Sequence, residues 1–143
     1  MSIDLKMANY IINKAFDLAL ERKLAALTVC ILDSGGHLVS AQRQDGSSIM
    51  RFEIAQGKAY AALALGRSTR FMQETLAVQR PGFVEALSVA ANGKFIPVAG
   101  GLIIRNSTGA VLGAIGVTGD SADNDETIGV DAVIAAGLSA GRD

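Results

Sequence analysis

The segment 97–126 constrains the fold more than any other part of the chain, because it holds two apolar runs around a short turn and then an acidic loop. The first run is Pro97-Val-Ala-Gly-Gly-Leu-Ile-Ile-Arg105, and the second begins at Ala110 and continues as Val-Leu-Gly-Ala-Ile-Gly-Val-Thr. Asn-Ser-Thr-Gly lies between them, and two such runs around a turn cluster predict a β-hairpin. Successive residues in both runs are apolar, so we expect both faces of the sheet to be covered.

Four glycines interrupt these two runs, namely Gly100, Gly101, Gly113 and Gly116. Glycine weakens a strand, and inside one it often marks a bulge or a place where another group approaches the backbone closely. An acidic loop follows the second run and leads into the last predicted helix. We therefore interpret the glycine-lined surface, next to the start of a helix, as the best candidate binding site. The prediction is that the absent side chains leave room for a small ligand.

The rest of the pattern predicts a second hairpin and several helices. Two apolar strands, at 24–33 and 37–43, flank the turn Asp33-Ser-Gly-Gly36. Helical spacing of apolar residues and capping signals predict helices at 4–23, 49–65, 68–77, 82–91 and 123–141. We expect Asp4 or Ser2 to cap the first of these helices and Gly66 to follow the end of the second. Asp123 and Glu126 have the spacing of a capping box at the start of the last helix. Hairpins give antiparallel pairs that helices must cover, so we expect one α+β domain spanning residues 1–143.

The charge pattern and hydropathy exclude several classes of protein. The net charge is −1 with scattered Lys and Arg, which argues against a nucleic-acid-binding surface. No apolar run approaches the roughly 18 residues of a membrane span. The N-terminal stretch lacks a basic region followed by a continuous apolar segment, so we expect no signal peptide and a cytoplasmic location. The mean hydropathy of +0.33 requires hidden apolar surface, and self-association is the simplest way to hide it.

The chain has one cysteine and one histidine, which exclude a standard zinc site and an internal disulfide. Cys30 lies in an apolar run, and we expect it to be a small buried residue of the core. His37 lies in the turn of the first hairpin, and we expect it on the surface. No Ser-His-Asp or Cys-His pairing can be read from the sequence.

Several segments, in this order along the chain, resemble the GlcG/HbpS family, which includes the C-terminal domain of PduO-type proteins. They are Val29-Cys-Ile-Leu-Asp-Ser-Gly-Gly36, Arg43-Gln-Asp45, Ala55-Gln-Gly-Lys58-Ala, Pro97-Val-Ala-Gly-Gly101, Val111-Leu-Gly-Ala-Ile-Gly-Val-Thr-Gly119 and Asp125-Glu126. The resemblance implies a profilin-like α/β fold, with an antiparallel sheet of about five strands between helices, and homo-oligomers that are often octamers. It also implies haem or iron binding, haem degradation, or an accessory role in small-molecule catabolism.

The sequence departs from the family pattern beside the glycines. The usual Gly-Gly-Leu-Pro-Ile is Gly100-Gly-Leu-Ile-Ile here, the usual Val-Ser-Gly is Val117-Thr-Gly, and the usual Arg-Met-Asp is Arg43-Gln-Asp45. These changes leave open whether the ligand is that of the haem-binding relatives. His37 is the one imidazole in the chain, and the first helix has none. The remaining candidate axial ligands for a haem are Met7, Met50, Met72, Tyr10 and Tyr60.

Four charged residues, Arg43, Asp45, Glu53 and Lys58, follow the first hairpin. One interpretation is an ion-pair network that fixes the turn from strand to helix. The other is an anion clamp, because Arg43 offers a forked pair of donors and Lys58 a point charge for a carboxylate. A buried Lys58 with a lowered pKa could also act as a base.

The acidic cluster around Asp125 and Glu126 also has two interpretations. In the first, the carboxylates cap the last helix and compensate its dipole. In the second, Asp125 and Glu126 are ligands of a divalent-cation or iron site. The backbone before it could bind a carboxylate or phosphate. The predicted ligand-binding residues are therefore Arg43, Asp45, Lys58, Gly100, Gly101, Gly116, Thr118 and Gly119.

Three functions remain open at this point. The first is an accessory protein that binds haem or another small ligand. The second is a small catabolic enzyme acting on a carboxylated metabolite, with Arg43 as the anchor and Lys58 or Glu126 in proton transfer. The third is a structural oligomer without a ligand.

Overall fold

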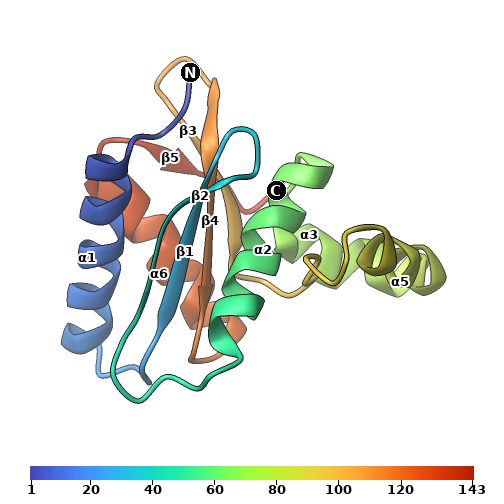
Figure 1. The fold of residues 1–143 in the computed structure, drawn as a ribbon, viewed down its shortest axis with the longest axis horizontal. Coiled ribbons are helices and arrows are strands. Elements are labelled where there is room, and N and C mark those ends of the chain that lie inside the picture. Colours follow the sequence, from blue (N-terminus) through green and yellow to red (C-terminus); the bar gives the residue numbers. More distant parts are fainter.

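The computed structural model describes all 143 residues and contains one five-stranded antiparallel sheet in the order β2-β1-β4-β3-β5 (Figure 1). Both predicted hairpins are present, and the α+β architecture is the one that the sequence predicts. The fifth strand is a two-residue edge strand that the sequence analysis assigned to the last helix. The strands are β1 (Thr28–Asp33), β2 (Leu38–Arg43), β3 (Gly101–Arg105), β4 (Val111–Thr118) and β5 (Ser139–Ala140).

Helices cover both faces of the sheet, as expected from the apolar runs. Helices α1 and α6 pack on one face, and α2 packs on the other (Figure 1). Residues 69–90 follow α2 and form a helical arm that projects away from the sheet (Figure 1). One turn inside this arm is a π-helix. The helices are α1 (Leu5–Glu21), α2 (Arg51–Leu65), α3 (Thr69–Phe71), η1 (Met72–Leu76), α4 (Ala77–Gln79), α5 (Pro81–Ala90) and α6 (Ala122–Ala135). None of these helices has the length and apolar character needed to cross a bilayer.

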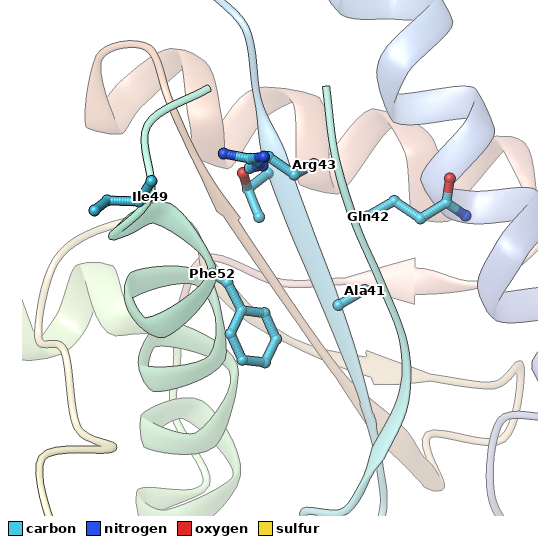
Figure 2. Close-up of a pocket in the computed structure, with 6 residues that line it drawn as sticks. Ala41, Gln42, Arg43, Ile49 and Phe52 are labelled. Carbon is cyan, nitrogen blue, oxygen red and sulfur yellow. The ribbon is translucent and has the colours of Figure 1, made fainter. Parts of the chain in front are cut away.

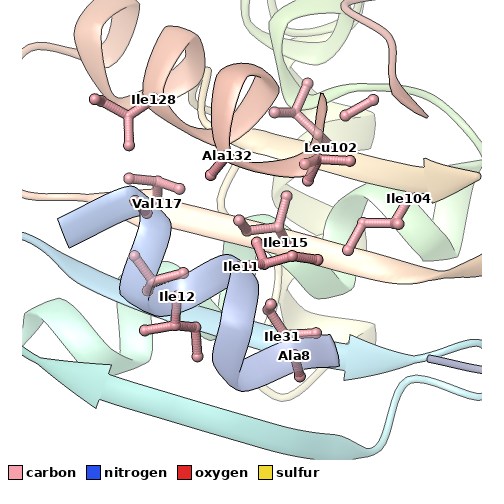
Figure 3. Close-up of a cluster of buried hydrophobic side chains, with 14 of the residues drawn as sticks. Ala8, Ile11, Ile12, Ile31, Leu102, Ile104, Ile115, Val117, Ile128 and Ala132 are labelled. Atoms are coloured by element: carbon pink, nitrogen blue, oxygen red, sulfur yellow. The ribbon is translucent and has the colours of Figure 1, made fainter. Parts of the chain in front are cut away.

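The larger core lies between the sheet and the α1–α6 layer (Figure 3). Branched aliphatic side chains fill it, including Ile11 and Ile12 of α1, Ile115 of β4 and Ile128 of α6. Burying one such side chain contributes about 1.5–3 kcal/mol. This layer therefore supplies most of the apolar burial that holds the helices to the sheet.

The core on the other face is small, because α2 lies very close to the sheet. It consists of Cys30, Leu32, Ala55, Ala59 and Ala114. Burial raises the pKa of the Cys30 thiol to about 12, so the residue is an inert part of the core, as expected.

The predicted helix ends are partly confirmed. The Asp4 carboxylate accepts a hydrogen bond from the backbone N–H of Met7 (2.8 Å) and caps α1, and Gly66 ends α2 in the left-handed region with φ of +67°. The predicted capping box of Asp123 and Glu126 is wrong. Ser121 caps α6 instead, accepting from the N–H of Asn124.

The physical reason for the wrong capping box is the position of Arg70. Its guanidinium forms ion pairs with both carboxylates that were predicted to cap the helix, with Asp123 at 2.5 Å and with Glu126 at 2.8 Å. The helix also ends at Ala135 rather than near residue 141, because the chain turns back and adds β5 to the edge of the sheet.

Candidate functional site

The space beside the predicted glycine surface is occupied by α2. A Cβ atom on Gly116 would lie 1.9 Å from the carbonyl oxygen of Ala55, and one on Gly101 would lie 2.2 Å from that of Lys58. Gly100 has φ of +125°, and its added Cβ would lie 2.6 Å from the carbonyl oxygen of Val117. The expectation of an open gap at these three glycines is wrong, because backbone packs directly on backbone there.

Other predicted glycines serve similar close approaches. An added Cβ on Gly113 would lie 2.1 Å from the carbonyl oxygen of Leu32, and one on Gly119 would lie 2.3 Å from that of Ala26. Gly119 also has φ of +145°, which favours glycine. The glycines thus mark where strands and α2 meet, and a role in binding a ligand stays a prediction.

Lys58 lies inside this contact rather than in a cleft. Its ammonium donates a hydrogen bond to the carbonyl of Val117 (2.9 Å) and lies 3.6 Å from Oδ2 of Asp125. Burial lowers the pKa of Lys58 and Asp125 partly offsets this, while burial raises the pKa of Asp125. Lys58 is only 2% exposed, and none of the hollows described below has it in its lining.

Glu126 is only 2% exposed and is held by two arginines. Nε of Arg70 donates to both carboxylate oxygens, at 2.8 and 2.9 Å, and Nε of Arg142 donates to one of them at 2.7 Å. The hydrogen bond to Glu126 is the main reason that the pKa of Arg70 is raised. Asp125 and Glu126 therefore face different cations, and no cluster of three ligating side chains is arranged to hold a metal. A metal site at Asp125 and Glu126 stays a prediction.

Arg43 ends β2 and makes no ion pair. One of its donors, Nη1, bonds the carbonyl oxygen of Ser47 at 3.1 Å. Asp45 and Glu53 do not pair with it, so the predicted ion-pair network is absent. Arg43 and Asp45 do line one hollow together, a depression of about 630 Å³ at the end of α1.

On its other side Arg43 lines a second hollow, which we call the β2–α2 pocket. It encloses about 310 Å³ and is lined by Thr28, Ala41, Gln42, Arg43, Ile49 and Phe52. Figure 2 shows the Phe52 ring and Ala41 on facing sides, with the guanidinium of Arg43 extending toward Ile49. A cation beside an aromatic and an aliphatic wall suits an anion with an apolar body.

A buried polar layer lies behind this pocket. The hydroxyls of Thr28 and Ser47 share a hydrogen bond of 2.9 Å, and Nη1 of Arg51 donates to Oγ1 of Thr118 at 2.7 Å. Thr28 faces Thr118 in the pairing of β1 with β4. Sequence reasoning singled out Thr118 but missed Arg51 and Thr28, because their partners are far away along the chain and no local motif connects them.

A third hollow, which we call the α1–α6 pocket, encloses about 410 Å³. It is lined by Asp4, Lys6, Met7, Tyr10, Ala135 and Ala136. The Tyr10 hydroxyl contacts the carbonyl oxygen of Ala135 at 3.4 Å. Met7 and Tyr10 were both predicted candidates for haem ligation, and they are three residues apart on one face of α1.

The other candidate axial ligands are less favourably placed. The His37 side chain is 81% exposed in the β1–β2 turn, with Nδ1 3.3 Å from Oδ1 of Asp33. Met72 is fully buried in the arm, and Met50 is exposed without lining a larger hollow. Tyr60 lines a small hollow of about 200 Å³ whose other walls are apolar side chains. The α1–α6 pocket is thus the place where two candidate ligands converge.

Comparisons with known proteins match nearly the whole chain. A family model described as haem degrading protein HbpS-like matches residues 3–134. An uncharacterised 15.0 kDa protein in the dhaT–dhaS intergenic region of Citrobacter freundii is 31% identical over 99 residues, which are 68% of this chain and 67% of that protein.

Solved structures show the same fold. A crystal structure of a PduOC–haem complex superposes with a TM-score of 0.82 at 22% identity, covering 99% of both chains. The ORFY protein of Klebsiella pneumoniae has a TM-score of 0.80 at 26% identity, over 94% of this chain and 89% of that one. A double mutant of Streptomyces reticuli HbpS has a TM-score of 0.76 at 24% identity, over 94% and 86%. The predicted resemblance is confirmed, and the chain belongs to the HbpS-like family.

Proposed function

We propose that this protein binds haem in the α1–α6 pocket, with Tyr10 as the axial ligand from the protein. The observation that carries the proposal is the convergence of Tyr10 and Met7 on one hollow, in a chain whose single histidine lies elsewhere. The family description and the haem present in the PduOC structure support the choice of ligand, although both describe relatives.

The side chains of this pocket fit a haem. Tyrosine and methionine both ligate haem iron in proteins. Lys6 is one of the lining residues, and its ammonium can pair with a propionate, while the carboxylate of Asp4 is engaged in capping α1. Two alanines leave a wall without bulky side chains. The volume of about 410 Å³ falls in the range of roughly 300–1,000 Å³ that is typical of small-molecule sites. When bound, the haem would supply redox-active iron, and Tyr10 and Lys6 would orient it.

Hemin titration followed by absorbance tests the proposal. We expect a shifted Soret band at about one hemin per chain, lost or weakened at least tenfold in Tyr10→Phe, because phenylalanine keeps the ring and removes the ligating oxygen. Met50→Leu is the matched control, since Met50 is exposed away from the pocket. An unshifted wild-type spectrum would refute haem binding, and an unchanged spectrum of Tyr10→Phe would refute this site.

We also propose that the protein forms a homo-oligomer. Val78, Phe83 and Val89 of the helical arm expose apolar side chains, and contact with a second copy would cover them. The octamer implied by the family resemblance stays a prediction that native mass spectrometry tests, as does the cytoplasmic location. A catalytic role for Lys58 or Glu126 has less support, since each is buried against opposite charge.

A further inference from the structure

We propose that the β2–α2 pocket is a separate binding site for a small organic carboxylate with a short apolar body. Arg43 would hold the carboxylate, and Phe52 and Ile49 would cover the apolar part. The site lies at the end of β2 and the start of α2, and none of its lining residues belongs to the α1–α6 pocket. It therefore does not depend on haem binding.

Arg43 is a cation without an ion-pair partner. Most other arginines have partners: Arg22, Arg70 and Arg142 form ion pairs, Arg67 and Arg80 stack on phenylalanine rings, and Arg51 donates to the Thr118 hydroxyl. Arg105, like Arg43, bonds only a carbonyl, but it lines a hollow of only about 30 Å³. Arg43 has one hydrogen bond, to a carbonyl, and its remaining N–H groups are free of protein acceptors. A guanidinium has five N–H donors in a fork that matches a carboxylate.

The pocket contains no competing negative charge. Its lining has no Asp or Glu. Glu53, in the first turn of α2, is exposed and does not line it, and Asp45 lines the hollow on the other side of Arg43. An anion that enters meets the guanidinium without repulsion from a carboxylate on the pocket wall.

The start of α2 forms one wall of the pocket through Phe52. The residue at the N-cap position is Met50, and no side chain caps the helix there. The first N–H groups of a helix carry partial positive charge, which favours a nearby anion. Glu53 in the first turn partly offsets this field, so the side chain of Arg43 is the main element of the site.

The apolar lining of the pocket defines the rest of the ligand. The Phe52 ring and Ala41 bound the pocket, and Ile49 at its rim is 86% exposed. A ligand with a few apolar carbons would remove part of this surface from water, whereas inorganic anions would not. The pocket volume of about 310 Å³ suits a metabolite of small size. No group positioned for proton transfer lines it, so we infer binding rather than turnover.

The test measures binding of phenylacetate and butyrate by ligand-observed NMR and calorimetry. We expect both to bind the wild type with millimolar affinity, and Arg43→Gln to weaken both about tenfold or more, since hydrogen bonds to a charged group are lost. Arg43→Lys should recover only part of the affinity, because it keeps the charge without the fork. Ile49→Ser should weaken phenylacetate several-fold.

Two matched controls make the result specific. Phenylacetamide has the same shape without the charge and should bind at least tenfold more weakly than phenylacetate. Arg80→Gln removes another arginine and should leave binding unchanged. Equal affinity of wild type and Arg43→Gln, equal affinity for phenylacetamide, or no binding of either carboxylate at about 20 mM would overturn the proposal. Hemin binding by Arg43→Gln should match the wild type, which separates this site from the haem site.

Discussion

Lys58 and Asp125 form a buried ion pair between two helices that cover opposite faces of the sheet. Nζ of Lys58, in α2, lies 3.6 Å from Oδ2 of Asp125, in α6. The same nitrogen bonds the carbonyl of Val117 near the end of β4, and Oδ1 of Asp125 accepts from the backbone N–H of Asp120. The pair therefore connects both helical layers at one end of the sheet.

Removing one member of this pair should be much worse than removing both. Lys58→Met leaves a buried carboxylate without its cation, and Asp125→Asn leaves a buried ammonium, so each should lower the free energy of unfolding by about 3–5 kcal/mol. The double variant buries neither charge and keeps an oxygen for the N–H of Asp120. Its loss should be smaller than the sum of the two single losses, as measured by urea unfolding. Additive losses would show that the two charges are not coupled.

The close contact of α2 with β4 should make Gly116 intolerant of any side chain. The Cβ of Gly116→Ala would lie 1.9 Å from a backbone oxygen, so we expect a loss of about 3 kcal/mol or more, or no folded protein. Gly82→Ala is the matched control, because nothing lies within 4 Å of its added Cβ and alanine favours the helix. Thermal unfolding of both variants checks this. A native-like melting temperature for Gly116→Ala would contradict the observed packing.

Asp120 should make stability depend on pH in the acid range. The backbone N–H of Ala25 and the amide of Asn124 donate to its carboxylate, at 2.9 and 2.7 Å. These bonds, above all the one from Ala25, lower the pKa of Asp120 below its ordinary value of 3.8. A carboxylate with a lowered pKa stabilises the fold above its unfolded pKa, and the contribution is lost as the pH falls through the folded value.

The measurement is the difference in melting temperature between the wild type and Asp120→Asn. We expect the wild type to be more stable at pH 6 and the difference to shrink below about pH 4. Asp17→Asn, an exposed aspartate on α1 that accepts no hydrogen bond from the protein, is the control. A constant difference across this range would show that the carboxylate charge is not responsible.

Much of the fold could be predicted because its signals are local. The two hairpins were visible as apolar runs around turn residues, and Asp4 and Gly66 marked true helix ends. The fifth strand was missed, because a two-residue edge strand has too few residues to show a period. Ser121 was missed as a cap because Asp123 has the same chemistry two residues later, and only the distant Arg70 decides between them.

The candidate sites were harder to predict, because they depend on contacts between distant segments. The glycines pointed correctly to a close approach, but the sequence could not show that the approaching group is the backbone of α2 at Ala55 and Lys58. The sequence identified Arg43 as a candidate. Only the structure shows that it has no ion pair, because Asp45 and Glu53 do not contact its guanidinium. The α1–α6 pocket joins residues more than a hundred positions apart, so Met7 and Tyr10 were two candidates among several.

The helical arm affects how the molecule would begin to unfold. Its apolar cluster, which includes Met72, Val84 and Phe95, is separate from the two clusters of the sheet and rests on α2 through Ala61. Proteins open in cooperative units along such boundaries. Partial detachment of the arm would expose apolar surface while the strands stay paired. Aggregation on storage should therefore begin from this unit rather than from complete unfolding.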